Sequence, residues 1–134
     1  DVINTLTPGS EGSTFGGYPL ASVVGTYAIK ILVDRELAKN AQIRGSQLMN
    51  CYEDIQAEFP DKIKDIRGKG LLTAFEMFNE PNLDGHRVSV ELLNKGVYAK
   101  ETHHSTVRIA PALTVETHHI DDIAEQIRDV IKSL

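Results

Sequence analysis

The segment Gly12-Ser13-Thr14-Phe15-Gly16-Gly17-Tyr18-Pro19-Leu20 is a polar, glycine-rich turn that leads directly into an apolar pattern of helical spacing. Pro19 stands where the helix is expected to begin, and proline is favoured at the first position of a helix. Free backbone N–H groups and the helix dipole both attract anions at such a junction. The local chemistry is that of a phosphate site with Ser13 and Thr14 as hydroxyl donors. A simple turn remains the commoner meaning of such a loop.

Length and composition narrow the class of protein. The chain has 134 residues, of which 41% are hydrophobic, so one domain with a substantial core is expected. The formal net charge of −5 argues against binding to nucleic acid or to an anionic membrane, and no apolar run reaches the length of a membrane span. The lone cysteine, Cys51, suits a reducing compartment, and we expect it to be a buried thiol in a cytoplasmic protein.

Two helical patterns follow the glycine-rich turn. Apolar residues recur at helical spacing from Pro19, and a second such pattern runs from Leu37 to near Phe59-Pro60. The sequence leaves open whether these are two helices or one bent helix. Asp34 is a candidate cap if the helix breaks there.

The remainder of the chain alternates between strand and helix compositions. Residues 71–77, 97–100 and 106–109 have the composition of strands, and residues 86–94, closed by Gly96, and the segment capped by Thr117 have that of helices. This order predicts an α+β fold in which helices cover one face of a small, mainly antiparallel sheet. We expect the residues from about Asp65 onward to form the compact unit.

Two further groups of polar residues raise questions of chemistry. Arg67-Gly68-Lys69-Gly70 could contact a phosphate, but a tight turn leading into a strand is the simpler interpretation. His103-His104 and His118-His119 are adjacent pairs whose side chains diverge on either a strand or a helix. Neither pair has a nearby cysteine or the i, i+4 spacing of a helical zinc site. We therefore expect surface histidines and no metal.

Arg108 is the second informative residue after the glycine-rich turn. It interrupts the otherwise apolar segment from Val107 to Pro111. Because an unpaired buried guanidinium is costly, Arg108 must either point to solvent or face a carboxylate. The local sequence does not choose between these two roles.

The glycine-rich turn resembles a known family. Its sequence, from Gly12 to Leu20, is similar to a segment of the class III (subgroup II) pyridoxal-phosphate aminotransferases. In that family the threonine matching Thr14 reaches across a dimer interface to the cofactor phosphate of the neighbouring subunit. The resemblance implies pyridoxal 5'-phosphate as cofactor, with Ser13 and Thr14 as its ligands, in a homodimer. This chain has Tyr18 where the family usually has asparagine.

Two later segments extend the resemblance in the family's order. Arg67-Gly68-Lys69-Gly70-Leu71 resembles the start of the small-domain sheet. Arg108-Ile109-Ala110-Pro111-Ala112-Leu113 resembles the family segment Arg-x-x-Pro-Pro-Leu, whose arginine recognises the substrate carboxylate. The resemblance thus assigns substrate binding to Arg108 and implies amino acid and 2-oxo acid substrates. Ala112 departs from the pattern because it replaces the second proline, and it is expected to loosen the turn without moving Arg108.

The resemblance also implies a domain organisation and a specific branch of the family. Residues 1–36 correspond to the end of the large cofactor domain, and residues 37–134 to the C-terminal small domain of a fold-type I enzyme. Lys100-Glu101-Thr102-His103 looks most like the bacterial ornithine aminotransferases, with acetylornithine and other class III ω-aminotransferases as the alternative. The family's Schiff-base lysine lies upstream of the glycine-rich turn, so the chain is expected to lack it and to be inactive alone.

A different class of function also accounts for part of the sequence. A non-enzymatic α+β regulatory or dimerisation module, with its long helices as the dimer surface, would explain the short strands and the missing lysine. It would not explain why the phosphate-loop and carboxylate-arginine motifs occur together in the family's order. We therefore expect the C-terminal part of an aminotransferase.

Overall fold

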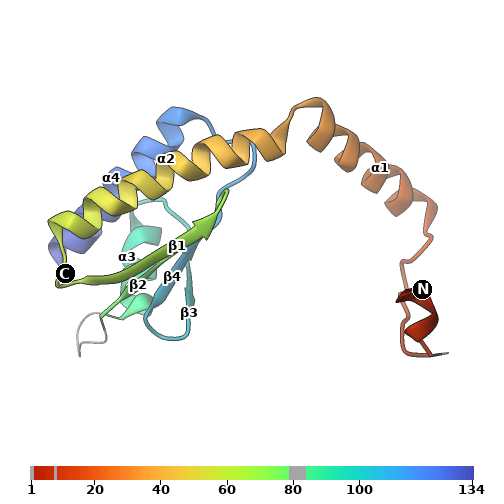
Figure 1. Ribbon diagram of the computed structural model, residues 1–134, viewed down its shortest axis with the longest axis horizontal. Helices are drawn as coiled ribbons and strands as arrows, with labels where there is room; N and C mark the ends of the chain where they lie inside the picture. Colours follow the sequence, from red (N-terminus) through yellow and green to blue (C-terminus); the bar gives the residue numbers. More distant parts are fainter. Residues whose placement is uncertain (1, 8, 79–83) are drawn as a thin grey trace. The chain divides into compact units, whose positions relative to one another are not determined.

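The computed structural model describes residues 2–7, 9–78 and 84–134. They form two compact units, Asp1–Arg35 and Glu36–Leu134. The first unit contains a short 3-10 helix, Val2–Thr5, and the helix α1, Pro19–Asp34. The second unit contains α2 (Leu37–Glu58), β1 (Ile63–Lys69), β2 (Leu72–Met77), α3 (Gly85–Asn94), β3 (Lys100–Thr102), β4 (Thr106–Ile109) and α4 (Thr117–Ser133), drawn in Figure 1.

The long helical region is two helices. α1 begins at Pro19, as predicted, and α2 begins at Leu37. Between them Glu36 takes a left-handed conformation, with φ of 48°, which an L-residue adopts in a helix only at a cost. Asp34 is the last residue of α1, and Glu36 is the N-cap of α2, so the assignment of Asp34 as a cap was wrong.

The sheet has four strands in the order β1-β2-β4-β3, and every neighbouring pair is antiparallel. This confirms the predicted small antiparallel sheet, but it contains one strand more than the sequence suggested. The missed strand, β1, is an edge strand in which buried and exposed residues do not alternate regularly. Ile63 is buried, and the other residues of the strand are half-buried or exposed. Arg67 lies within this strand, and the turn that was expected there comes later, at Gly70, which has a φ of +57°.

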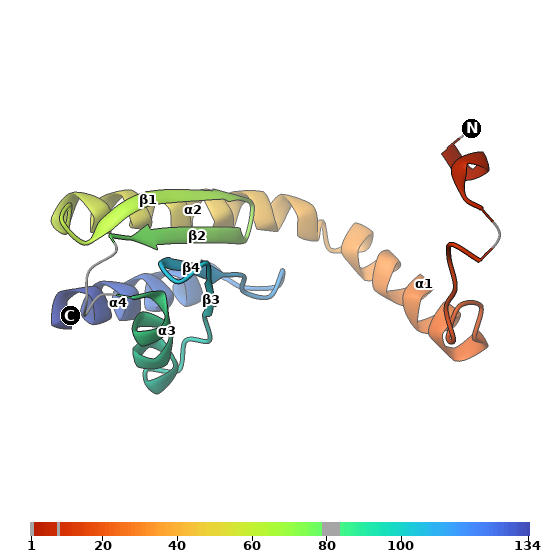
Figure 2. The same ribbon diagram turned by 90° about the horizontal axis from the view of Figure 1, so that it is seen from below.

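The core of the second unit lies on one face of the sheet. Phe75 on β2 pairs with Val107 on β4, and both side chains are fully buried. α2 and α4 pack against each other, and α2 also packs on β1 and β2 (Figures 1 and 2). Leu48, Tyr52 and Ile55 of α2 are buried in this core. The compact unit therefore begins at Glu36, and the expectation that it begins near Asp65 was wrong because α2 supplies part of the core.

A short chain of hydrogen bonds satisfies the polar groups inside this core. The Tyr52 hydroxyl lies 3.1 Å from Thr73 Oγ1, and the Thr73 hydroxyl in turn donates to the carbonyl oxygen of Ile109 at 3.0 Å. Burial raises the pKa of Tyr52, so its hydroxyl stays protonated. These two hydrogen bonds link α2, β2 and β4. They also leave no hydroxyl of Tyr52 or Thr73 unpaired in the core, where an unpaired polar group would cost free energy.

Side-chain caps mark the N-terminal ends of α3 and α4. The Asp84 carboxylate accepts a hydrogen bond from the backbone N–H of Arg87 at 2.7 Å, and Gly96, with a φ of +84°, follows the end of α3 as predicted. Glu116 is the N-cap of α4 and shares a capping box with His119. Thr117 was predicted to be this cap, but it is the first residue of the helix.

The strand β3 begins at Lys100, three residues later than predicted.

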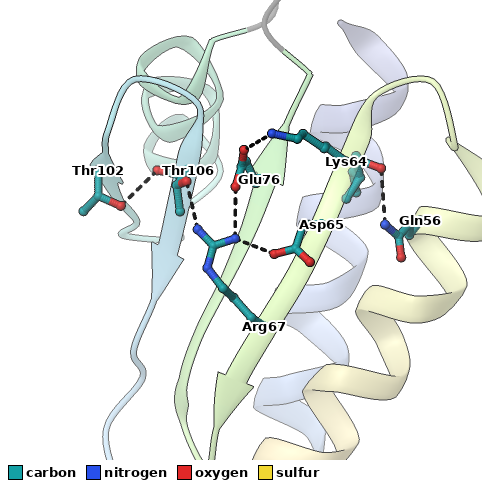
Figure 3. A network of polar contacts seen from close by, with 8 residues as sticks. Gln56, Lys64, Asp65, Arg67, Glu76, Thr102 and Thr106 are labelled. Carbon is teal, nitrogen blue, oxygen red and sulfur yellow. Dashed lines mark hydrogen bonds and ion pairs between the residues drawn. The ribbon is translucent and has the colours of Figure 1, made fainter.

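The face of the sheet opposite the core carries an ion-pair network (Figure 3). Glu76 on β2 accepts hydrogen bonds from Lys64 at 2.7 Å and from Arg67 at 3.1 Å. Arg67 also pairs with Asp65 and donates to Thr106 Oγ1 on β4 at 3.2 Å. The guanidinium of Arg67 therefore reaches across β2 and joins three strands.

Gly45, in the middle of α2, allows that helix to approach the turn between β1 and β2. A Cβ atom built on Gly45 would clash with the backbone of Gly70. We expect Gly45→Ala to lower the free energy of unfolding by about 1–3 kcal/mol, despite the better helix propensity of alanine, because the packed backbone must move. Chemical denaturation of the chain measures this change.

Gly25→Ala is the matched control for Gly45→Ala. Gly25 also lies inside a helix, α1, but a Cβ atom there would meet nothing within 4 Å. The control should leave the stability of the second unit unchanged. An equal loss in both variants, or no loss in Gly45→Ala, would contradict the close approach of α2 to Gly70.

The ion-pair network predicts a pH dependence of stability. Hydrogen bonds from Lys64, and then from Arg67, lower the pKa of Glu76 in the folded chain. A depressed folded pKa stabilises the fold above the ordinary glutamate pKa, and this contribution disappears as the pH falls through the lowered value. Glu76→Gln should therefore be less stable than the wild type at neutral pH, and the difference should shrink in acid. Denaturation across a pH series checks this, with the exposed Glu125→Gln as control.

Candidate functional site

The glycine-rich turn forms an exposed loop in front of α1. The N–H of Tyr18 donates to the carbonyl of Phe15 at 3.0 Å, and Gly17 has a φ of +77°, which suits glycine. Ser13 and Thr14 are exposed, and neither hydroxyl has a hydrogen-bond partner among the described residues. Both hydroxyls are thus open to a ligand.

The N-terminus of α1 has the properties of an anion site. Its N-cap, Tyr18, makes no side-chain hydrogen bond to the helix, and Pro19 occupies the first helical position. No acidic residue stands in the first turn. The backbone N–H groups of the first turn therefore have no side-chain cap, and the positive end of the helix dipole adds to their attraction for an anion.

α1 itself exposes an unusual amount of apolar surface. None of its residues is buried. Large apolar side chains, such as Leu20 at 63% and Tyr27 at 64% of full exposure, are open along its length. An apolar surface of this kind is typical of a segment that packs against another protein surface.

Arg108 lies on β4 between two core residues. Val107 and Ile109 are buried, whereas Arg108 is exposed, so its side chain stands on the open face of the sheet. Its Cα partners are Ala74 on β2 and Lys100 on β3. Across residues 2–7, 9–78 and 84–134, nothing forms a hydrogen bond or an ion pair with the Arg108 side chain. Of the two alternatives left open by the sequence, the structure therefore shows the first: Arg108 points to solvent and faces no carboxylate of the described chain. Its guanidinium is accessible to a ligand.

The loop that follows Arg108 is held by α2. The side-chain amide of Asn40 donates to the carbonyl oxygens of both Leu113, at 2.8 Å, and Val115, at 3.0 Å. The N–H of Val115 also closes a turn onto the carbonyl of Ala112 at 3.0 Å. The amide of Asn40 restrains this turn from another element, and the loosening expected from Ala112 stays a prediction. No local pattern near residue 112 points to this contact.

The site residues belong to different units. Ser13 and Thr14 lie in the first unit, and Arg108 lies in the second. Each unit thus holds its own candidate residues, the start of α1 in the first unit and the exposed Arg108 on β4 in the second.

The histidines and Cys51 are the other residues whose chemistry the sequence raised. His119 accepts a hydrogen bond from the N–H of Glu116 within the capping box, and its ring contacts His118. Over the part of the chain that the structure describes, no three His, Cys, Asp or Glu side chains are placed to hold a metal ion. Cys51 is half-buried, and burial raises the pKa of its thiol, which disfavours the reactive thiolate. Within the described ranges, no helix combines the length and apolar character needed to cross a bilayer.

Comparison with known proteins identifies relatives along almost the whole chain. The family model described as Aminotransferase class-III matches residues 1–131. The mitochondrial ornithine aminotransferase of Oryza sativa subsp. japonica is 33% identical over 98% of this chain and 28% of its own length. Ornithine aminotransferase 1 of Staphylococcus aureus (strain MRSA252) is 36% identical over 99% of this chain and 32% of its own length.

Solved structures show the same relationship. The ornithine aminotransferase from Toxoplasma gondii ME49 superposes with a TM-score of 0.85 at 33% identity, covering 98% of this chain and 31% of that one. The acetylornithine aminotransferase from Elizabethkingia anophelis gives a TM-score of 0.85 at 30% identity, over 99% of this chain and 33% of that one. Another structure of the Toxoplasma gondii enzyme carries PLP at partial occupancy in its active site.

The chain spans about a third of the length of the relatives it matches. The similarity in structure confirms the predicted fold class, a part of a fold-type I aminotransferase with a small antiparallel sheet and covering helices. The family match over residues 1–131 shows that this chain belongs to the class-III aminotransferase family.

Proposed function

We propose that this chain is the C-terminal part of an ornithine aminotransferase. The whole enzyme transfers the δ-amino group of L-ornithine to a 2-oxo acid, and the products are glutamate 5-semialdehyde and an amino acid. The observation that carries this proposal is Arg108, an exposed guanidinium without a partner in the described chain, on the open face of a sheet shared with ornithine aminotransferases.

The start of α1 fits the phosphate of pyridoxal phosphate. Ser13 and Thr14 offer two hydroxyl groups, and the uncapped N–H groups after Tyr18 offer backbone donors at the positive end of a helix dipole. When bound, the cofactor supplies an electron sink for the amino-group transfer. The role of Ser13 and Thr14 is to hold its phosphate.

Arg108 is proposed to hold a substrate carboxylate. Its planar guanidinium can donate two parallel hydrogen bonds to one carboxylate, which fixes orientation as well as charge. Its pKa keeps it protonated, so it binds and orients but does not move a proton. The amide of Asn40 holds the loop that follows, and thereby supports the end of β4.

The domain organisation and the assembly are also proposals. Residues 1–36 are assigned to the end of the large cofactor domain, and residues 37–134 to the small domain. The division of the chain between Arg35 and Glu36 supports this assignment. We propose a homodimer in which Thr14 reaches the cofactor of the partner subunit, and the exposed apolar side chains of α1 are consistent with burial in such an assembly. Activity then requires the Schiff-base lysine of the whole enzyme, and the chain alone is inactive.

Two properties of the whole enzyme have alternatives, its amino donor and its cellular location. Acetylornithine is the alternative donor, and the similarity to the enzyme of Elizabethkingia anophelis supports keeping it. Comparing kcat/KM for ornithine and N-acetylornithine in the whole enzyme decides between them.

We propose a cytoplasmic location on the basis of the lone cysteine, although two plant relatives are named as mitochondrial. Imaging of the tagged enzyme tests this.

Thr14→Ala in the whole enzyme should weaken the retention of pyridoxal phosphate. The variant removes one hydroxyl hydrogen bond to a charged acceptor, worth about 1.5–3 kcal/mol, or roughly ten- to a hundred-fold in affinity. Substrate preference should hardly change, because the phosphate is remote from the reacting carbon. Cofactor absorbance measures occupancy. Thr26→Ala, an exposed threonine further along α1, is the control and should retain the cofactor.

Arg108→Ala should have the opposite pattern. The cofactor should stay bound, while kcat/KM for ornithine and for 2-oxoglutarate should fall by the equivalent of about 2–5 kcal/mol. Arg108→Lys should recover part of the loss, because a point charge replaces a planar fork. The control is Arg128→Ala, which removes a half-buried arginine on α4 that is paired with Glu58. Values of kcat/KM within about two-fold of wild type in Arg108→Ala would leave Arg108 a structural residue.

A further inference from the structure

A groove opens beside α4 in the second unit. It has a volume of about 590 Å³, and it is lined by α4, by the loop that follows β4 and by the loop that follows α3. α4 contributes His119, Asp122, Ile123 and Gln126, which are three or four residues apart and therefore share one side of the helix. A volume of this size is typical of sites that bind small organic molecules.

Hydrogen bonds and an ion pair restrain both walls of the groove. In the loop after β4, the side-chain amide of Asn40 binds the carbonyl oxygens of Leu113 and Val115, at 2.8 and 3.0 Å. In the loop after α3, Lys95 pairs with Asp129 of α4 at 3.1 Å. A ligand thus meets walls that are already held in place, and such preorganisation lowers the entropic cost of binding.

The charges that line the groove do not cancel. Lys95 is already neutralised by Asp129. The ring of His119 is neutral, because its Nδ1 accepts the N–H of Glu116 at 3.1 Å and therefore carries no proton of its own. The carboxylate of Asp122 has no hydrogen bond and no ion pair with any residue in the described ranges. One uncompensated negative charge therefore remains in the groove.

The other groups beside Asp122 are apolar or neutral. Val97, Val115 and Ile123 are half-buried and line the same groove. The side-chain amide of Gln126 also lines it and makes no hydrogen bond within residues 2–7, 9–78 and 84–134. A ligand that complements these groups carries a positive charge for the carboxylate and an apolar part for the aliphatic side chains.

We propose that this groove binds a small organic cation, an ammonium or guanidinium group on a short aliphatic chain. Asp122 accepts hydrogen bonds from the cationic group, and Val97, Val115 and Ile123 contact the aliphatic chain. Such a ligand touches both α4 and the loop after β4. The inference concerns a binding site, and it does not depend on the proposed transaminase function.

The test compares two probes of the same shape in the whole enzyme. N-butylguanidinium is positively charged, and N-butylurea is its neutral counterpart. Neither probe carries the aliphatic amine that an aminotransferase would transfer. We expect calorimetry to show about five-fold tighter binding of the cation. Asp122→Asn should abolish this preference and leave the affinity for N-butylurea unchanged, because only the charge of the groove is lost.

Glu125→Gln is the matched control for Asp122→Asn. Glu125 is also an exposed carboxylate of α4 that has no partner in the described chain, but it does not line the groove. This control should keep the preference for the cation. Ile123→Ala shortens the apolar wall, and it should weaken the binding of both probes by the same factor.

Three outcomes would overturn the cation site. They are equal affinity of the wild type for the two probes, a preference that survives Asp122→Asn, and an equal loss of preference in Glu125→Gln. None of them bears on the proposed function, because kcat/KM of Arg108→Ala reports on transamination whichever probe binds.

Discussion

The antiparallel pairing of β2 with β4 is the interaction on which the rest of the second unit depends. In this pair each residue position is committed to one face by the alternation of a strand. Phe75 and Val107 face inward and are fully buried, so the next position along β4, Arg108, must face outward. A shift of one residue would bury the guanidinium and expose the core. The burial of apolar side chains therefore also places the guanidinium of Arg108 on the exposed face of the sheet.

The two faces of this sheet are stabilised by different means. On the inner face the hydroxyls of Tyr52 and Thr73 satisfy each other and a strand carbonyl without any charge. On the outer face the ion-pair network around Arg67 joins strands in contact with water, where each pair contributes little alone. The inner contacts determine the fold, and the outer ones determine which charges remain available to a ligand.

The sequence predicted those features whose causes are local. Pro19 marked the start of α1, and the apolar neighbours of Arg108 identified its strand. The polar strand β1 was missed because an edge strand needs little alternation when a neighbour supplies the hydrogen bonds. The boundary near Asp65 was wrong because an amphipathic pattern does not say which surface a helix covers. The roles of Ser13, Thr14 and Arg108 came from the family resemblance and remain predictions.

The contact made by Asn40 has a consequence for how this sequence can vary. In the family pattern a second proline stiffens the loop after the arginine strand through its own ring, and this chain has Ala112 there. The amide of Asn40, on a different helix, now restrains the same loop through two carbonyl groups. We therefore expect the effect of a substitution at position 112 on stability to depend on the residue at position 40. Such epistasis means that replacing Asn40 should be better tolerated after a proline has been restored at position 112.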